Sequence, residues 1–292
     1  EYLQSFSVSP ESRTQDLQDI VLFLEERCRT ENTFFVHGRG KRKSRNQRYF
    51  ELFHRFLDRQ TIYDWHTAGF QGRNNYCKTD PDAAFMHMKD DHMRNAQLKP
   101  GYNVQIAVDS EYIVAADIFQ DRNDVWTLVP FLKTMEKNLE FRYPSVTADS
   151  GYESEEAYTY LRSAKQKPYI KPQTYEKWKK RSFKQDISKR ENMGYDEKTD
   201  PYTCHAGKSL SPIFMKKQKS KSGYESEVTV YECEDCTDCP YKERCTKAKG
   251  NKRLYISKSF LEKRQESYEN ILSEKGIQYR MNRSIQVEGA FG

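Results

Sequence analysis

The chain has 292 residues, of which 32% are charged and 36% hydrophobic, and its mean hydropathy is -0.99. This composition excludes a membrane-spanning bundle, and the 16 Phe, 20 Tyr and 3 Trp exclude a wholly disordered chain. The net charge of +6 favours a polyanionic partner only weakly. No secretory signal opens the sequence, so we expect a cytoplasmic protein that does not associate with membranes. Helical patterns are cut at Glu1 and at Gly292, so we also expect a fragment.

Two helices and a basic segment are predicted in the N-terminal part. Residues 14–29 place Leu17, Ile20, Val21 and Leu24 at the spacing of an amphipathic helix, and residues 48–65 are compatible with a second one. Between them lies "HGRGKRKSRNQR", which is either a solvated loop or an arm that contacts phosphates. Its candidate DNA-binding residues are Arg39, Lys41, Arg42, Lys43 and Arg45.

The middle of the chain predicts a mixed sheet. "TDPDA" at 79–83 marks a turn, and residues 101–120 read as an antiparallel hairpin with "DSE" at its turn. A helix over 124–138 follows, and its buried stripe is expected to be Trp126, Leu128, Val129, Leu132 and Met135. After it come a strand over 145–148, a helix over 154–164 and a strand over 167–172. This order of elements is typical of an α/β fold.

The character of the sequence changes over 173–258. Lysine becomes frequent, the periodicity weakens and most of the cysteines occur here, which indicates an insertion with its own means of stabilisation. The tail from 259 to 292 is helical in pattern, with a break expected at Gly276.

The cysteines indicate a structural zinc site. Cys236 and Cys239 form a CxxC pair, and Cys245 follows shortly after them. Cys204 and Cys233 compete for the fourth position, and reduced thiols without a metal are the alternative. A site of four thiolates would stabilise a small polar insertion that lacks a large core.

Two carboxylates are candidates for magnesium ligands. Asp149 ends the strand at 145–148, and Glu288 lies among apolar residues of the terminal helix. A charge in such surroundings needs a partner, and a divalent cation with oxygen ligands can join two elements. Each residue also has a simpler explanation, because Asp149 is a good helix cap and Glu288 can be an ordinary charge near a helix end.

Several motifs in order resemble the DDE transposases of bacterial insertion sequences. They are the stretch from "TDPDA" to "NVQIAVD", "TADSGYESEEAY", "CTDCPYKERC" and "RSIQVEGAFG", and the resemblance covers the chain from about residue 77 to its end. It implies an RNase H-like core with a cysteine-bearing insertion before the last acid.

The resemblance also implies roles for particular residues. Asp149 matches the second acid of the catalytic triad and Glu288 the third. Cys204, Cys236, Cys239 and Cys245 match the family's cysteines, which leaves Cys233 as an extra thiol. Arg280 and Arg283 precede Glu288 and are placed to meet phosphate.

The first acid has no counterpart in this chain. The family carries it in a "DGT" or "DGS" motif on a strand before the hairpin, and neither motif is present. Asp109 lies in the predicted hairpin turn, and Asp80 and Asp82 match a motif to which no catalytic role is carried over. The DNA-binding helices that precede the core in the family are also missing.

These observations predict an RNase H-like mixed sheet flanked by helices, with a zinc-stapled insertion and a C-terminal helix. The expected parts are a helical and basic segment (1–76), the core (77–172), the cysteine-rich insertion (173–258) and C-terminal helices that return the last acid to the core (259–292). The expected function is metal-dependent DNA cleavage and strand transfer at transposon ends, with Mg²⁺ as the catalytic ion and Zn²⁺ as the structural one. The partners would be transposon ends, target DNA and further copies of the chain in a synaptic complex. Without its first acid the polypeptide is expected to be inactive alone, and the rival interpretation is a non-catalytic, zinc-dependent nucleic-acid-binding remnant or regulator.

Overall fold

The structure is a computed structural model that describes residues 13–88 and 93–290, apart from the side chains of Glu288 and Ala290. The chain divides into two compact units, Glu1–Gly101 and Tyr102–Gly292. The boundaries expected from the sequence at 76, 172 and 258 stay predictions. Among the described residues, no helix combines the length and the apolar character that a membrane crossing requires.

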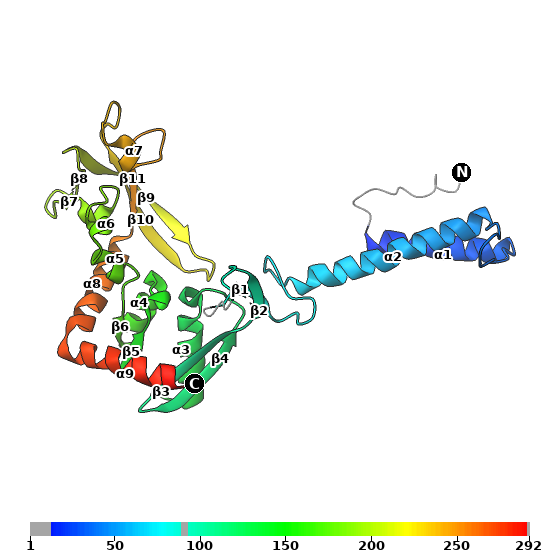
Figure 1. Ribbon diagram of the computed structural model, residues 1–292, viewed down its shortest axis with the longest axis horizontal. Helices are drawn as coiled ribbons and strands as arrows, with labels where there is room; N and C mark the ends of the chain where they lie inside the picture. Colours follow the sequence, from blue (N-terminus) through cyan, green and yellow to red (C-terminus); the bar gives the residue numbers. More distant parts are fainter. Residues whose placement is uncertain (1–12, 89–92, 291–292) are drawn as a thin grey trace. The chain divides into compact units, whose positions relative to one another are not determined.

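The first unit is built on a pair of helices, α1 (Thr14–Thr30) and α2 (Arg45–Gly69), which lie alongside each other in Figure 1. Both helices were predicted. The apolar side chains of α1 face α2 and form a small core with Phe53. α2 begins after Ser44, whose Oγ accepts a hydrogen bond from the Gln47 N–H at 3.1 Å. A short antiparallel pair that the sequence did not predict, β1 (Ala84–His87) and β2 (Leu98–Gly101), completes the unit.

The second unit begins with the predicted hairpin, β3 (Asn103–Asp109) and β4 (Tyr112–Phe119). Its turn residues Ser110 and Glu111 have φ values of 50° and 71°, which gives the backbone twist that a two-residue hairpin loop needs. The next elements in chain order are η2 (Asp124–Trp126), α3 (Leu128–Leu139), β5 (Ser145–Ala148), η3 (Ser150–Tyr152), α4 (Glu155–Ser163) and β6 (Lys167–Ile170). β5 and β6 are parallel, as expected for strands joined by a helix.

One hydrophobic core holds these elements together. Its fully buried residues come mainly from α3, α4 and β6, and side chains of β3, β4 and β5 pack against them. The predicted stripe is confirmed at Leu128, Val129, Leu132 and Met135 of α3, whereas Trp126 lies in η2 and is only partly buried. Within the described residues, β3 pairs only with β4 and β5 only with β6. The two sheets pack against the same core, and β3 and β5 each have one unpaired edge. The mixed α/β class is therefore confirmed.

The cysteine-rich part contains a five-stranded sheet of its own, in the strand order β11-β10-β9-β8-β7. Its elements in chain order are α5 (Tyr175–Trp178), α6 (Arg181–Lys184), η4 (Arg190–Asn192), β7 (Gly194–Tyr195), β8 (Tyr202–Thr203), β9 (Ser209–Lys219), β10 (Glu225–Cys233), α7 (Lys242–Cys245) and β11 (Arg253–Ile256). Tyr202, Leu210 and Tyr231 form its core together with Cys233 and Cys236. The strands were not predicted because several are very short and the long strand β9 is mostly exposed, so it lacks a clear alternation.

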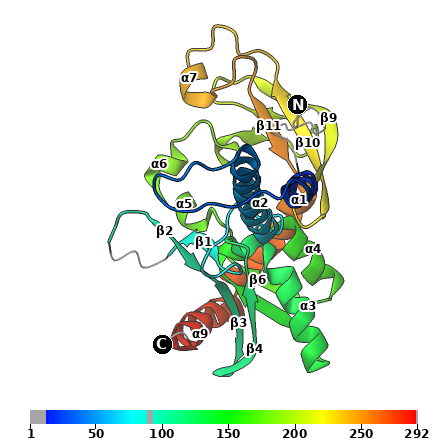
Figure 2. The same cartoon turned by 90° about the vertical axis from the view of Figure 1, so that its right-hand side faces the viewer.

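The C-terminal tail forms α8 (Lys258–Leu272) and α9 (Glu274–Ala290), and Figure 2 shows α9 beside β3. The break between the two helices falls at Ser273, where ψ is 156°, and not at Gly276 as expected. Gly276 lies inside α9, where it permits a close contact between the two helices. A Cβ atom at this position would be 2.0 Å from the carbonyl oxygen of Asn270, so only glycine allows the start of α9 to approach the end of α8.

We therefore expect Gly276→Ala to lower the free energy of unfolding by about 1–3 kcal/mol, because backbone must move to admit the methyl group. Gly289→Ala is the matched control in the same helix, since nothing lies within 4 Å of its Cβ position. Alanine favours a helix over glycine, so that control is expected to be neutral or slightly stabilising. Urea unfolding of both variants measures the difference, and equal stabilities would show that the close approach is not tight.

Candidate active site and cysteine pocket

Asp149 lies where β5 ends, at the edge of the parallel pair, and its side chain is 58% exposed. The Ser150 N–H donates to Asp149 Oδ1 at 2.6 Å, so the carboxylate caps the short helix η3. It does not cap α4, because the Ser154 Oγ accepts the Ala157 N–H there at 3.0 Å. The cap therefore engages Oδ1, and the exposure of the side chain leaves the carboxylate accessible from solvent.

A polar network that the sequence did not reveal supports the turn after Asp149. Asp124 Oδ1 accepts hydrogen bonds from Asn103 Nδ2 at 2.9 Å and from Gln105 Nε2 at 3.2 Å. The Tyr152 hydroxyl donates to Gln105 Oε1, which connects η3 to β3. Asn103 and Gln105 lie two residues apart on one face of β3, and Ala107 on the same face packs against the core. Two polar residues on a core-facing side of a strand were the available signal.

The electrostatics of this network keep Tyr152 protonated. Burial is the main cause that raises the pKa of Tyr152 to about 12; Asp124 and Asp149 act in the same direction, and Arg283 opposes them. Because the hydroxyl keeps its proton, it remains a donor to Gln105 over the whole neutral range. Gly151 permits the close packing, since a Cβ there would be 3.0 Å from Asp124 Oδ2. Contacts with β3 and η2 therefore stabilise the turn that carries Asp149.

α9 brings the predicted C-terminal residues to the same edge. It packs against β3 and β5, and Arg283 Nη2 is 4.0 Å from Asp149 Oδ2. Glu288 is on the same helix five residues further on, about 7.5 Å along the axis. Its side chain lies outside the described residues, so the convergence of the two acids stays a prediction. The buried Nε atom of Arg280 has no hydrogen-bond partner among the described residues, and its guanidinium carbon is 5.9 Å from the Tyr175 ring centre.

The predicted basic arm is a loop that runs into α2. Arg39, Lys41 and Arg42 are exposed on the loop, and Arg45 is the first residue of α2. Lys43 is already engaged, because its Nζ is 2.5 Å from Glu51 Oε2. The buried side chain of Gln47 fastens the loop by bonds to both the N–H and the carbonyl of Val36; they are 3.0 Å and 2.8 Å long. These residues belong to the first unit, and their role in binding DNA stays a prediction.

The other acids considered in the sequence lie in turns. Asp109 is the last residue of β3, exposed beside the hairpin turn, as expected. Asp80 and Asp82 belong to the turn before β1, where the Asp82 N–H donates to Asp80 Oδ1 at 3.3 Å.

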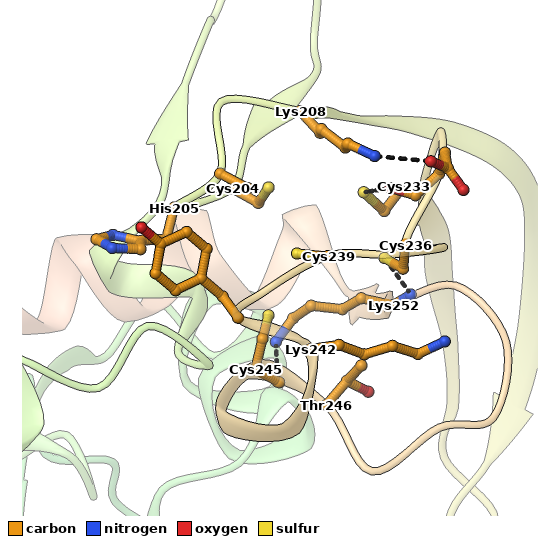
Figure 3. Close-up of a pocket in the computed structure, with 13 residues that line it drawn as sticks. Cys204, His205, Lys208, Cys233, Cys236, Cys239, Lys242, Cys245, Thr246 and Lys252 are labelled. Atoms are coloured by element: carbon orange, nitrogen blue, oxygen red, sulfur yellow. Dashed lines mark hydrogen bonds and ion pairs between the residues drawn. The ribbon is translucent and has the colours of Figure 1, made fainter.

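A second site is a small pocket of about 20 Å³ lined by thiols. Figure 3 shows their sulfur atoms directed into one space; they belong to Cys204, Cys233, Cys236, Cys239 and Cys245. Two of these positions are set by tight turns of the backbone. The Gly207 N–H donates to the Cys204 carbonyl at 2.9 Å, and Asp238, inside the CxxC pair, has a φ of 51°. The pocket can hold about one atom of the size of a water molecule or metal ion.

A buried lysine lies beside these thiols. Lys252 is 6% exposed, and its Nζ donates to the carbonyls of Ser188 at 2.7 Å and Cys245 at 2.9 Å. Its backbone N–H points to Cys236 Sγ at 3.4 Å. Burial raises the pKa of Cys233 to about 12, whereas Lys252 lowers that of Cys245 and so opposes the effect of burial there. The sequence reasoning missed Lys252, because nothing in its local pattern distinguishes it from the many exposed lysines.

The arrangement of donors does not by itself define a metal centre. Over residues 13–88 and 93–290, no three His, Cys, Asp or Glu side chains are grouped closely enough to hold an ion. The chemistry of the pocket nevertheless fits a soft divalent metal, because thiols are the donors that zinc prefers and a buried ammonium group balances thiolate charge.

Comparison with known proteins gives one match. The model of the family described as Transposase DDE domain matches residues 203–292, the stretch with the thiol pocket, α8 and α9. No curated protein and no solved structure matches the chain. The matched stretch includes Cys204 and Glu288 but begins downstream of Asp149, so it does not include this residue. Residues 203–292 are therefore similar to the transposase DDE domain, which confirms over this stretch the resemblance to DDE transposases that the motifs indicate.

Proposed function

We propose that the chain is part of the catalytic region of a bacterial insertion-sequence transposase, which cleaves DNA at transposon ends and joins it to target DNA. The observation that carries this proposal is the approach of α9 to the end of β5. Arg283, on the helix that bears Glu288, lies 4.0 Å from Asp149, so two elements that are far apart in the sequence meet at one exposed carboxylate. The family match over 203–292 supports the same conclusion.

The two-stranded sheets support an RNase H-like core. β3–β4 and β5–β6 share one hydrophobic core, and in the part of the chain that the structure describes β3 and β5 each pair on one side only. A further strand pairing with both would join them into one mixed sheet. We propose that such a strand carries the first acid, in the "DGT" type motif that this chain does not contain.

The residues at the edge of β5 fit the binding of a hard cation. Asp149 presents an exposed carboxylate oxygen beyond the one that caps η3, and oxygen is the donor that Mg²⁺ prefers. Asp149, Glu288 and the missing first acid would hold it. When bound, Mg²⁺ activates water and stabilises the leaving oxygen of a phosphodiester. The chain itself would contribute two further elements: Arg280 and Arg283 to hold the phosphate, and the Tyr152–Gln105–Asp124 network to keep Asp149 in position.

Zinc is proposed as the structural ion of the thiol pocket. We propose Cys204, Cys236, Cys239 and Cys245 as its ligands, with Cys233 as the extra thiol. Four thiolates and one Zn²⁺ carry a net charge of about −2, of which the buried ammonium group of Lys252 would balance one half. DNA as substrate, assembly of several copies in a synaptic complex and a cytoplasmic location belong to the same proposal.

A test of this function measures Mg²⁺-dependent nicking of supercoiled plasmid. We expect the polypeptide alone to be inactive, because its catalytic acids are incomplete, and activity to appear when an in-frame strand with the "DGT" motif is restored from the gene. In the restored protein, Asp149→Asn should reduce the rate by about 10³-fold or more, as expected when a ligand of the catalytic ion is lost.

Asp109→Asn is the matched control, since it removes an exposed carboxylate from the hairpin turn of the same core. It should leave the rate unchanged. Nicking by the original polypeptide that depends on Asp149 would refute the predicted inactivity. A gene in which a start codon directly precedes Glu1, with no such strand, would favour the non-catalytic remnant.

A further inference from the structure

The outer face of the β9–β10–β11 sheet carries two exposed aromatic side chains. Phe214 of β9 and Tyr255 of β11 both pair with Val230 of β10, so the three residues form one row. Residues that are directly opposite in antiparallel strands project to the same side. The neighbouring residue Tyr231 belongs to the core on the other side. Phe214 is 50% exposed and Tyr255 56%, although Val230 between them is buried.

The same face carries a lysine beside the aromatic rings. Lys216, two residues along β9, places its Nζ 4.6 Å from the centre of the Tyr255 ring, so its ammonium group lies over the same side of the sheet. On this face β10 also carries Glu232, whose Oε2 lies 2.6 Å from Arg253 Nε on β11. This ion pair neutralises the charge of Glu232. The stretch 205–224 has no Asp or Glu. Of its lysines, Lys216 projects to this face, whereas the others lie on the opposite face of β9 or are paired with Asp235, Glu225 and Asp121.

The edge of this sheet is poorly suited to pairing with another strand. β9 pairs with β8 only at Ser209 and Leu210, so in the described structure residues 211–219 form an edge. Pro212 lacks an N–H, a register shift interrupts the ladder beside it, and lysines follow. These features discourage edge-to-edge association, so a second copy is a poor candidate for the occupant.

The end of the β9–β10 hairpin is anchored to the core. Lys221 Nζ is 2.7 Å from Asp121 Oδ1, and the Tyr224 hydroxyl lies 2.9 Å from Thr159 Oγ1 on α4. Ser222 also bonds to Glu156. The aromatic face is therefore held by a hairpin fixed at both ends, and it does not have to be ordered when a ligand binds.

We propose that this face binds an unpaired stretch of DNA. Bases would stack on Phe214 and Tyr255, and Lys216 would contact the phosphates between them, because aromatic rings beside cations on a sheet are the chemistry that recognises single strands. The proposal rests on the proposed function for DNA as the partner, and it adds a binding surface separate from the Asp149 site.

Binding is measured by fluorescence anisotropy with a labelled oligothymidine of about 16 nucleotides, and with the same strand in a duplex, over a series of salt concentrations. No magnesium is added, so the result is independent of cleavage. We expect Phe214→Ala and Tyr255→Ala each to weaken binding of the single strand about 5-fold or more, and to affect the duplex less. Tyr255→Phe should retain the affinity, because it keeps the ring. Lys216→Ala should lower the slope of log affinity against log salt by about 0.7, the value for one phosphate contact.

The matched control is Tyr112→Ala on β4, which removes a 76% exposed aromatic ring from another part of the same unit. It should leave the affinity unchanged. The proposal is overturned if both aromatic variants bind the single strand within two-fold of the parent, or if Tyr112→Ala weakens binding equally. It is also overturned if sedimentation shows that the aromatic variants change self-association and not DNA affinity. Loss of cleavage in Asp149→Asn with unaltered binding would leave it standing, so the two proposals fail separately.

Discussion

Replacing Cys236, a proposed zinc ligand, by serine is expected to abolish the proposed zinc binding and to unfold the β7–β11 sheet. Cys236 is 7% exposed and packs in the core of this sheet, so the loss would remove both a ligand and the closure of the pocket. Structural zinc contributes about 10–16 kcal/mol of apparent binding free energy in small zinc domains at neutral pH, far more than the core of this sheet can replace. Metal analysis of the purified protein measures the zinc, and hydrogen exchange of the β10 amides measures the unfolding.

Two other cysteines provide the controls. Cys28 is buried in α1 of the first unit, so Cys28→Ser should keep one zinc per chain. Cys233→Ser should also keep the metal if Cys233 is the extra thiol, whereas Cys204→Ser should lose it. The opposite result for this last pair would make Cys233 the ligand and Cys204 the extra thiol. A parent protein without zinc would refute the site.

Replacing Arg264 by alanine is expected to have the second large effect, because it breaks a buried ion pair. The Nε atom of Arg264, on α8, lies 2.8 Å from Glu153 Oε1. The side chain of Arg264 is 12% exposed and that of Glu153 is 2% exposed. Glu153 also accepts the Gln173 N–H at 2.7 Å and the Tyr158 hydroxyl at 3.2 Å. Removing the cation leaves a buried carboxylate without its counter-charge, which costs about 3–5 kcal/mol of unfolding free energy. Urea unfolding at pH 7 measures the loss.

The pH dependence of this variant has a definite sign. Burial raises the pKa of Glu153 above its ordinary value of 4.5, and Arg264 partly lowers it. Without Arg264 the pKa of Glu153 in the folded state rises further, so the folded protein holds a proton that the unfolded chain has released. The stability of the variant therefore falls as pH rises between the two pKa values, and its deficit should be smaller at about pH 5 than at pH 7.

Arg162→Ala is the control for this effect, because Arg162 also joins α4 to α8. Its ion pairs with Glu262 and Glu266 are 3.0 Å and 2.7 Å long, but its side chain is 46% exposed. Exposed pairs are screened by water, so the expected loss is about 0–1 kcal/mol with little dependence on pH. Equal losses in the two variants would show that burial does not determine the strength of these pairs.

Local patterns were sufficient for the elements of the core. The spacing of Leu128, Leu132 and Met135 predicts α3, and alternation with a polar turn predicts the β3–β4 hairpin, because both signals come from residues a few positions apart. The same holds for the position of Asp149 at the end of a strand and for the clustering of the cysteines. Motif resemblance then indicated the transposase DDE domain, which the family match confirms over residues 203–292.

The contacts around the candidate sites depend on tertiary packing. The placement of Arg283 beside Asp149, of Asp124 against Gln105 and of Lys252 among the thiols each joins segments whose meeting is set by how helices and sheets pack. The same applies to the row of Phe214 and Tyr255, which is created by strand register and by a shift in that register next to Val230. Periodicity reports which face of an element is buried, but not which other element covers it, and for this reason these neighbours could not be derived from the sequence.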